Sequence, residues 1–101
     1  MHDVFEALAH PVRREILRLL RNGAMSAGDL AKNFDLAKPT LSGHFAVLKS
    51  AGLVGTQRKG TTILYRLNMS VMEEALAAVL ELAGKAGKRG ADKWTYARRS
   101  S

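Results

Sequence analysis

The sequence predicts a mainly α-helical fold that carries a small β-hairpin. Three observations support this prediction. Apolar residues recur at helical spacing in four short segments between residues 4 and 50. The spacing changes to every second residue between residues 54 and 67, and a helical pattern returns from residue 72 to residue 83. With 101 residues, 47% of them hydrophobic, the chain suits one compact domain.

The first two helices are predicted on either side of a proline. Val4, Phe5 and Leu8 lie at spacings i, i+1 and i+4, which indicates a short amphipathic helix that ends near His10. Pro11 suits the first turn of the next helix, where its missing N–H would have no partner. The apolar stripe of this second helix consists of Val12, Ile16, Leu19 and Leu20, and its other faces carry Arg13, Arg14, Arg18 and Arg21.

The third helix is predicted to begin at Ser26. Asp29 follows three residues later, which is a weaker relative of the Ser-x-x-Glu capping box. The apolar face of this helix consists of Ala27, Leu30, Ala31 and Phe34. The tight connection "DLAK" of residues 35–38 then leads into a fourth helix.

The fourth helix is predicted from Leu41, Phe45 and Leu48, and Gly52 ends it. It contains Gly43, although a glycine inside a helix costs roughly 1 kcal/mol against alanine. At 100° per residue, Gly43 lies about 200° from Leu41, on the face opposite the core. Small residues share or flank that face: Pro39, Thr40, Ser42, Ala46 and Ser50. Either the bare spot lets another molecule approach the backbone closely, or it is a defect tolerated on an idle surface.

A basic hairpin and a long helix are predicted to follow. Residues 54–58 and 63–67 alternate as strands, and "RKGTT" with Gly60 makes the turn. The last helix carries an apolar stripe of Met72, Ala75, Leu76, Val79, Leu80 and Ala83. This stripe is wider than one neighbour can cover, which favours packing against a second copy. Residues 85–101 are predicted to be a flexible basic tail, in which no role is assigned to Trp94 and Tyr96.

The charge distribution indicates a polyanionic partner. The net charge is +7, and no acidic residue occurs between Asp35 and Glu73. The basic residues of that stretch are Lys38, Lys49, Arg58, Lys59 and Arg66. A basic block on a patterned segment is typical of nucleic-acid binding, and a charge that serves only solubility is the alternative. Three short helices, a basic hairpin and a further helix together predict a winged helix-turn-helix domain over residues 1–84, with the fourth helix in the DNA major groove.

Three segments resemble a known family. "ALAHPVRREILRLL", "MSAGDLAKNFDLAKPTLSGHFAVLKSAGLV" and "RKGTTILYRLN" are similar to the ArsR-type bacterial repressors, and within them to the SdpR-like autorepressor branch. The similarity spans roughly residues 2 to 83. It implies a cytoplasmic homodimeric transcriptional repressor, nucleoid-associated when bound to a palindromic DNA operator. It also implies a dimer interface on the first and last helices, formed by Val4, Phe5, Leu8, Met72, Leu76, Val79 and Leu80.

The resemblance also implies which residues bind DNA. The groove-facing positions are Lys38, Pro39, Thr40, Ser42, Gly43 and His44, the wing positions are Arg58, Lys59, Gly60 and Thr61, and Ser26 and Lys49 complete the set. His44 lies about 300° from Leu41, so a phosphate contact or packing at the helix edge is expected of it. Arg13 and Arg14 are expected on a solvated face, near the DNA backbone, or beside a carboxylate such as Glu6.

Two positions depart from the family pattern. Ala37 stands where a serine often caps the recognition helix, so one cap hydrogen bond is missing. Gly43 stands where a long polar or basic residue is more usual. Direct reading of bases from that position is therefore lost, and specificity must come from Lys38, Thr40, Ser42 and His44, or from DNA shape. We expect an operator unlike those of close relatives.

No metal, cofactor or catalytic site is predicted. The chain has no cysteine, and its last helix offers Glu73, Glu74 and Glu81 without a histidine. His2 and His10 would lie about 12 Å apart on a straight helix, so a site that joins them with Asp3 is not expected. Any effector is expected to be a partner protein or a small molecule. The sequence contains no nucleophile paired with a base, and "GKAGKRG" lacks the spacing of a P-loop, so an enzyme is not expected.

Two alternative functions remain open at this point. A winged helix can also act as a protein-interaction module, and a strongly basic chain can bind DNA without sequence preference. A protein-binding surface would normally expose large apolar anchors, and the segment from 38 to 50 has none outside its core stripe. The sequence contains neither a signal peptide nor an apolar run near 18 residues, so neither secretion nor membrane insertion is expected.

Overall fold

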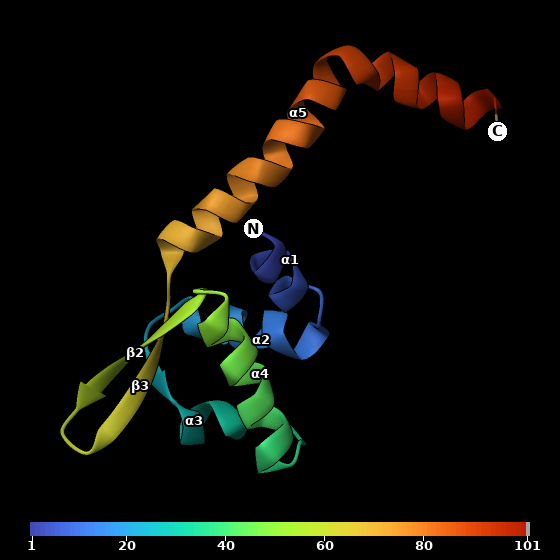
Figure 1. The fold of residues 1–101 in the computed structure, drawn as a ribbon. Helices are drawn as coiled ribbons and strands as arrows, with labels where there is room; N and C mark the ends of the chain where they lie inside the picture. The colour runs from blue at the N-terminus through green and yellow to red at the C-terminus, as the bar shows by residue number, and fades with distance from the viewer. Residues whose placement is uncertain (101) are drawn as a thin grey trace.

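The computed structural model describes residues 1–100, and the side chains of residues 1–84 (Figure 1). The elements in chain order are α1 (His2–Leu8), α2 (Pro11–Leu20), β1 (Met25–Ser26), α3 (Ala27–Ala31), α4 (Lys38–Ser50), β2 (Val54–Lys59), β3 (Thr62–Leu67) and α5 (Met69–Ser100). This order confirms a mainly helical fold with a β-hairpin. The wing, residues 54–67, is the hairpin of β2 and β3.

The wing belongs to a three-stranded antiparallel sheet in the order β1-β3-β2. The β2–β3 register runs from Val54 opposite Leu67 to Lys59 opposite Thr62, and Gly60 makes the turn at φ 63°. The sequence did not predict β1, in which Met25 pairs with Tyr65. Two residues are too few to show the alternation that marks a strand, so only its tertiary partner β3 defines β1.

The core lies between the helices and one face of the sheet. Its buried side chains come from α1, α2, α3, α4, Leu53 directly before β2, the start of β2, and α5. Phe45 of α4 stacks on Tyr65 of β3 with ring centroids 4.8 Å apart, which fixes α4 against the sheet. Val4 is 6% exposed and is part of this core. The place of Val4 in a dimer interface, expected from the family resemblance, stays a prediction.

Most helix ends agree with the expected signals. The Ser26 hydroxyl accepts a hydrogen bond from the Asp29 N–H at 3.1 Å and begins α3, although α3 ends earlier than predicted, at Ala31. Ala37 makes no side-chain cap bond to α4, as expected. Gly52 follows α4 with a φ of 79°, in the left-handed region where side chains are strained.

The last helix is longer at both ends than the sequence pattern. It begins at Met69 rather than Met72, because Asn68 precedes it and its Oδ1 accepts from the Val71 N–H at 3.5 Å. Its backbone is helical through Ser100, and the flexible tail expected for residues 85–101 stays a prediction. Alanine, lysine and arginine, frequent there, are strong helix formers. The side chains of Trp94 and Tyr96 lie outside those described, and the domain boundary at residue 84 stays a prediction.

Over the residues that the structure describes, no helix combines the length and the hydrophobicity needed to cross a lipid bilayer.

Candidate nucleic-acid interface

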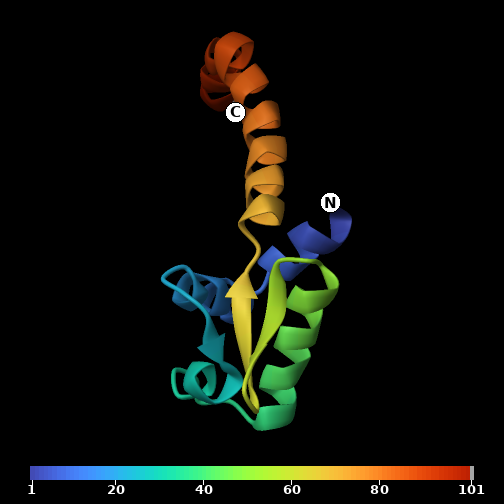
Figure 2. The same ribbon diagram turned by 90° about the vertical axis from the view of Figure 1, so that its left-hand side faces the viewer.

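The N-terminal turns of α4 and the tip of the wing lie on the same side of the molecule. In Figures 1 and 2 the tip of the wing and the first turns of α4 lie at the end away from α5. Helix α3 lies beside α4, so the two form the helix pair expected from the sequence. In a helix-turn-helix, the second helix of such a pair enters the major groove.

The outer face of α4 carries small side chains. Leu41, Phe45 and Leu48 are buried, at 3%, 6% and 0% exposure, and thus define the inner face. The outer residues Lys38, Pro39, Thr40, Ser42, Gly43 and Ala46 are all exposed. A Cβ atom added at Gly43 would meet no atom within 4 Å, so nothing inside the protomer requires a glycine there. The angular prediction from the sequence is therefore confirmed.

The first turn of α4 has unpaired backbone donors. The first four N–H groups of a helix lack partners within the helix, and Ala37 supplies no side-chain acceptor. Pro39 has no N–H, which leaves those of Lys38 and Thr40 directed outward. Backbone N–H groups at a helix N-terminus bind phosphate oxygens favourably. Because no side chain caps α4, the N–H groups of Lys38 and Thr40 are available to an anion.

Four exposed basic side chains have no acidic partner among the side chains of residues 1–84. They are Lys38 and Lys49 of α4 and Arg58 and Lys59 of the wing. Ion pairs do occur elsewhere on the surface, as between Arg18 and Glu15 at 3.1 Å. Unpaired cations gathered on one segment attract a polyanion and release its counterions on binding. Gly60 and Thr61 at the wing tip are exposed beside them.

Two of the predicted DNA-binding residues have structural roles in the protomer. Ser26 caps α3, as described above. His44 is half-buried, with its ring centroid 4.4 Å from that of His10 and its Nδ1 3.3 Å from Nη1 of Arg13. Edge packing is therefore what the structure shows for His44, and contact with DNA stays a prediction for both residues. Since a guanidinium only donates, Nδ1 of His44 is the acceptor in this contact.

Arginine side chains of α2 cap the end of α1. Arg13 donates to the backbone oxygens of Ala7 at 2.8 Å and Glu6 at 3.0 Å, and Arg14 donates to that of Leu8 at 2.8 Å. These bonds satisfy carbonyls that a helix C-terminus leaves free. This role was not predicted from the sequence, although the proline directly after a short helix is a signal that the two helices meet at a corner.

His44 is expected to make the fold sensitive to acid. Burial, then the nearby His10 and Arg13, lower the pKa of His44 from its ordinary 6.5. The unfolded chain therefore binds more protons below pH 6.5, and the free energy of unfolding falls as pH drops toward the lowered pKa. Urea unfolding at about pH 7.5 and about pH 5.5 should show a smaller pH-dependent loss in His44→Asn than in the wild type. An equal loss in both proteins would assign the acid sensitivity to other groups.

The predicted dimer surface is partly open. Phe5, Leu76, Val79 and Leu80 are exposed, at 39%, 56%, 47% and 57%. Leu8 and Met72 are half-buried within the protomer. Exposed large apolar residues on successive turns of one helix mark an interaction surface.

The histidines near the N-terminus are separated by the fold. His10 caps α2 by accepting from the Val12 N–H at 3.1 Å and faces His44. His2 instead lies near Asp3 and Glu6, and the ligand atoms of these three exposed residues are within 4.8 Å of one another. Exposed side chains on one turn of a short helix often meet in this way, so the grouping alone assigns no metal.

The chain was compared with known proteins. A family model described as a helix-turn-helix domain matches residues 8–57. The transcriptional repressor SdpR of Bacillus subtilis is 41% identical over 85 residues, which cover 84% of this chain and 94% of that protein. An ArsR family transcriptional regulator of known crystal structure matches with a TM-score of 0.75 at 29% identity, over 82% of this chain and 91% of the other. A homodimeric winged helix-turn-helix DNA-binding domain from Mycobacterium bovis matches with a TM-score of 0.66 at 31% identity, over 85% and 79%.

Proposed function

The chain belongs to the ArsR-type family of winged helix-turn-helix transcription regulators, and we propose that it is a homodimeric, metal-independent repressor that binds a palindromic operator. Its relatives are DNA-binding regulators, so it is not an enzyme. The single observation that carries the proposal is the surface of α4 and the wing, where unpaired cations border small, exposed side chains. We call the set Lys38, Pro39, Thr40, Ser42, Gly43, Lys49, Arg58, Lys59, Gly60 and Thr61 the α4–wing surface.

Two kinds of contact are expected on the α4–wing surface. Lys38, Arg58 and Lys59 contact phosphates, which positions the protein but reads no sequence. Thr40 and Ser42 are short and polar, so they reach base edges only when the helix backbone lies close to the groove. Gly43 permits that approach because it adds no atom to the outer face of α4.

The proposed dimer forms through α5. The exposed stripe of Leu76, Val79 and Leu80 has no cover within the protomer, and the Mycobacterium bovis domain is described as homodimeric. A two-fold dimer repeats one patch on both protomers and presents two α4 helices to DNA. Two copies of the same reading helix recognise two inverted half-sites, which is the reason for a palindrome.

Metal independence is proposed from the donor atoms available. The chain contains no cysteine, and the segment of α5 with Glu73, Glu74 and Glu81 contains no histidine. Transition metals are usually bound in proteins by thiolate and imidazole groups. The similarity to SdpR supports autoregulation, so the promoter region of its own gene is the first operator to test.

The proposal is tested by a salt titration on two DNA duplexes, one from upstream of its own gene and one scrambled, with and without chelator. Tighter binding to the upstream duplex, unchanged by chelator, is expected. Equal and steeply salt-dependent binding to both would favour a non-specific DNA-binding protein. No binding at low salt would favour a protein-interaction module.

Lys59→Ala and Ser42→Ala should separate the two kinds of contact. Removing the Lys59 charge should weaken binding to every duplex and reduce the slope of log K against log salt by about 1 for each protomer, thus by about 2 for the dimer. Ser42→Ala should instead narrow the ratio between operator and scrambled DNA, because it removes a base-edge contact and no charge. Fluorescence anisotropy at several salt concentrations measures both quantities. An equal loss on both duplexes for Ser42→Ala would contradict its assignment.

A further inference from the structure

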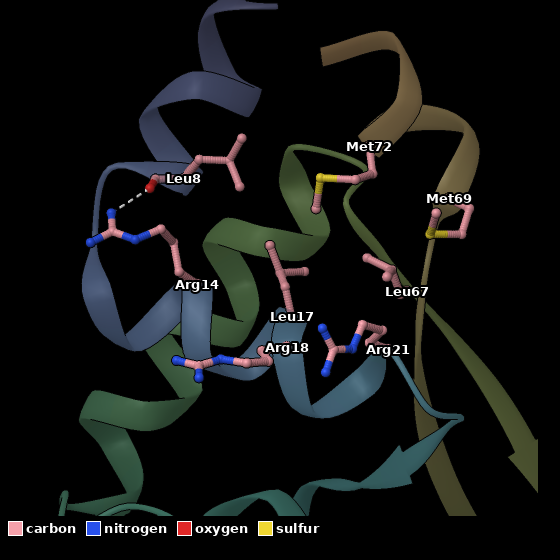
Figure 3. Close-up of a pocket in the computed structure, with 8 residues that line it drawn as sticks. All are labelled: Leu8, Arg14, Leu17, Arg18, Arg21, Leu67, Met69 and Met72. Carbon is pink, nitrogen blue, oxygen red and sulfur yellow. Dashed lines mark hydrogen bonds between the residues drawn. The ribbon is translucent and has the colours of Figure 1, made fainter. Parts of the chain in front are cut away.

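A hollow of about 350 Å³ lies where the helical body meets α5 (Figure 3). Apolar side chains from four elements form its walls: Leu8 of α1, Leu17 of α2, Leu67 of β3, and Met69 and Met72 of α5. Leu17, at 5% exposure, forms the floor. The volume is at the small end of the range of about 300–1,000 Å³ found for small-molecule sites.

Positive charge borders this apolar hollow. Arg14 and Arg18 of α2 and Arg21, the residue directly after that helix, line it, and none of its lining residues is acidic. Arg14 is held by the Leu8 carbonyl at 2.8 Å, and Arg18 pairs with Glu15 at 3.1 Å. The exposed Arg21 side chain has no hydrogen bond or ion pair with the side chains described, residues 1–84. Arg21 is thus the guanidinium available to a ligand.

We propose that the hollow binds a small amphipathic monocarboxylate. An apolar chain or ring of the ligand would displace water from Leu17 and Met72, which is favourable in proportion to the area covered. Its carboxylate would accept two hydrogen bonds from Arg21, because the guanidinium presents parallel donors that match carboxylate geometry. Leu8 and Met72 are also expected in the dimer interface, so a second copy is the competing occupant. Its apolar helix would remove three arginines from water without supplying an anion, which favours the carboxylate.

The position of the hollow points to regulation, a consequence that rests on the proposed repressor function. Leu67 is the last residue of β3 and Met69 the first of α5, so one residue, Asn68, separates the wing from the proposed dimer helix. A ligand that contacts both sides of this junction would favour one placement of α5 relative to the wing. In a dimer that placement sets the distance between the two α4–wing surfaces, and thus the affinity for the operator.

The site can be tested without DNA through its methionines. The chain has four methionines, of which Met69 and Met72 line the hollow while Met1 and Met25 do not. In protein labelled with ¹³C at the methionine methyls, octanoate should shift the signals of Met69 and Met72 saturably and leave those of Met1 and Met25 in place. Octanol, with the same chain and no charge, should bind about tenfold more weakly, equivalent to about 1.4 kcal/mol.

Arg21→Gln should raise the dissociation constant for octanoate about tenfold and leave that for octanol unchanged. Arg66→Gln removes the same charge from an exposed arginine outside the hollow, so it should bind octanoate like the wild type. Circular dichroism of both variants checks that they are folded. Equal affinity of octanoate and octanol, or of Arg21→Gln and wild type, would overturn the anion site.

Two further outcomes would also overturn the proposal. A shift of all four methionine signals together would indicate general detergent action. Signals of Met69 and Met72 that change on dilution but not with octanoate would mean that a second copy covers the hollow.

The regulatory part of the proposal is tested separately, by measuring operator affinity at saturating octanoate. A change in that affinity of about threefold or more is expected. An unchanged affinity while octanoate fills the hollow would refute regulation alone. Loss of operator binding by the free protein would instead refute the proposed function and leave the methionine result intact.

Discussion

Leu80→Glu is expected to separate the dimer and reduce operator affinity about 100-fold, equivalent to about 2.8 kcal/mol. Leu80 is 57% exposed in the protomer, so the substitution leaves the core intact. In the proposed dimer the same change would bury a carboxylate among apolar side chains on both copies, and burying an unpaired charge is strongly unfavourable. A separated protomer would contact one half-site only. Sedimentation equilibrium measures the mass, and fluorescence anisotropy measures the affinity.

Leu82→Glu is the matched control for this variant. Leu82 is on the same helix and is 76% exposed, but it lies about 200° around α5 from Leu80. The same charge introduced there should leave both the mass and the operator affinity close to those of the wild type. A Leu80→Glu protein that remains dimeric would place the interface on another surface. A Leu82→Glu protein that separates would mean that the interface extends around α5.

Gly43→Ala should stabilise the protein and weaken its binding to DNA at the same time. Alanine gains roughly 1 kcal/mol over glycine inside a helix, and the added methyl group meets no atom within 4 Å. For a domain of this size the melting temperature should rise by about 4–8 °C. The new Cβ points outward, however, toward the DNA in the proposed complex. Operator affinity should therefore fall about tenfold, which is equivalent to about 1.4 kcal/mol.

Gly28→Ala separates the two effects. Gly28 lies on the short helix α3, and a Cβ there would meet only Ser26 Oγ at 3.9 Å, which is ordinary contact. This variant should keep operator affinity while its stability stays the same or rises. Differential scanning calorimetry and anisotropy measure the two quantities for both variants. If Gly43→Ala is more stable and binds the operator as well as the wild type does, the outer face of α4 does not contact DNA closely at that position.

Much of the fold could be predicted from the sequence because its signals are local. The stripe of Leu41, Phe45 and Leu48 predicted the buried face of α4, and all three are buried. Gly60 predicted the turn of the wing, where its φ is 63°. In each case the physical cause, helical periodicity or a left-handed backbone angle, involves residues close together in the chain.

The sequence left undetermined the features in which a residue's environment comes from distant parts of the chain. Only the structure shows that Val4 packs into the core of its own protomer. Arg14 and Arg21 both line the hollow, yet only Arg14 is also bonded to the end of α1, through the Leu8 carbonyl. The sequence left a phosphate contact or edge packing open for His44, and in the structure its burial, then the nearby His10 and Arg13, lower its pKa.

The sequence by itself determined the order of the elements, the small-residue face of α4 and the acid-free basic stretch between Asp35 and Glu73. These follow from periodicity, turn chemistry and charge, which depend on neighbours in the chain. Only the tertiary structure decided the existence of β1, the packing of His44 against His10 and Arg13, and the hollow beside α5. Each of these requires surfaces from separate elements to meet, and the free energy of such contacts depends on packing that no local pattern encodes.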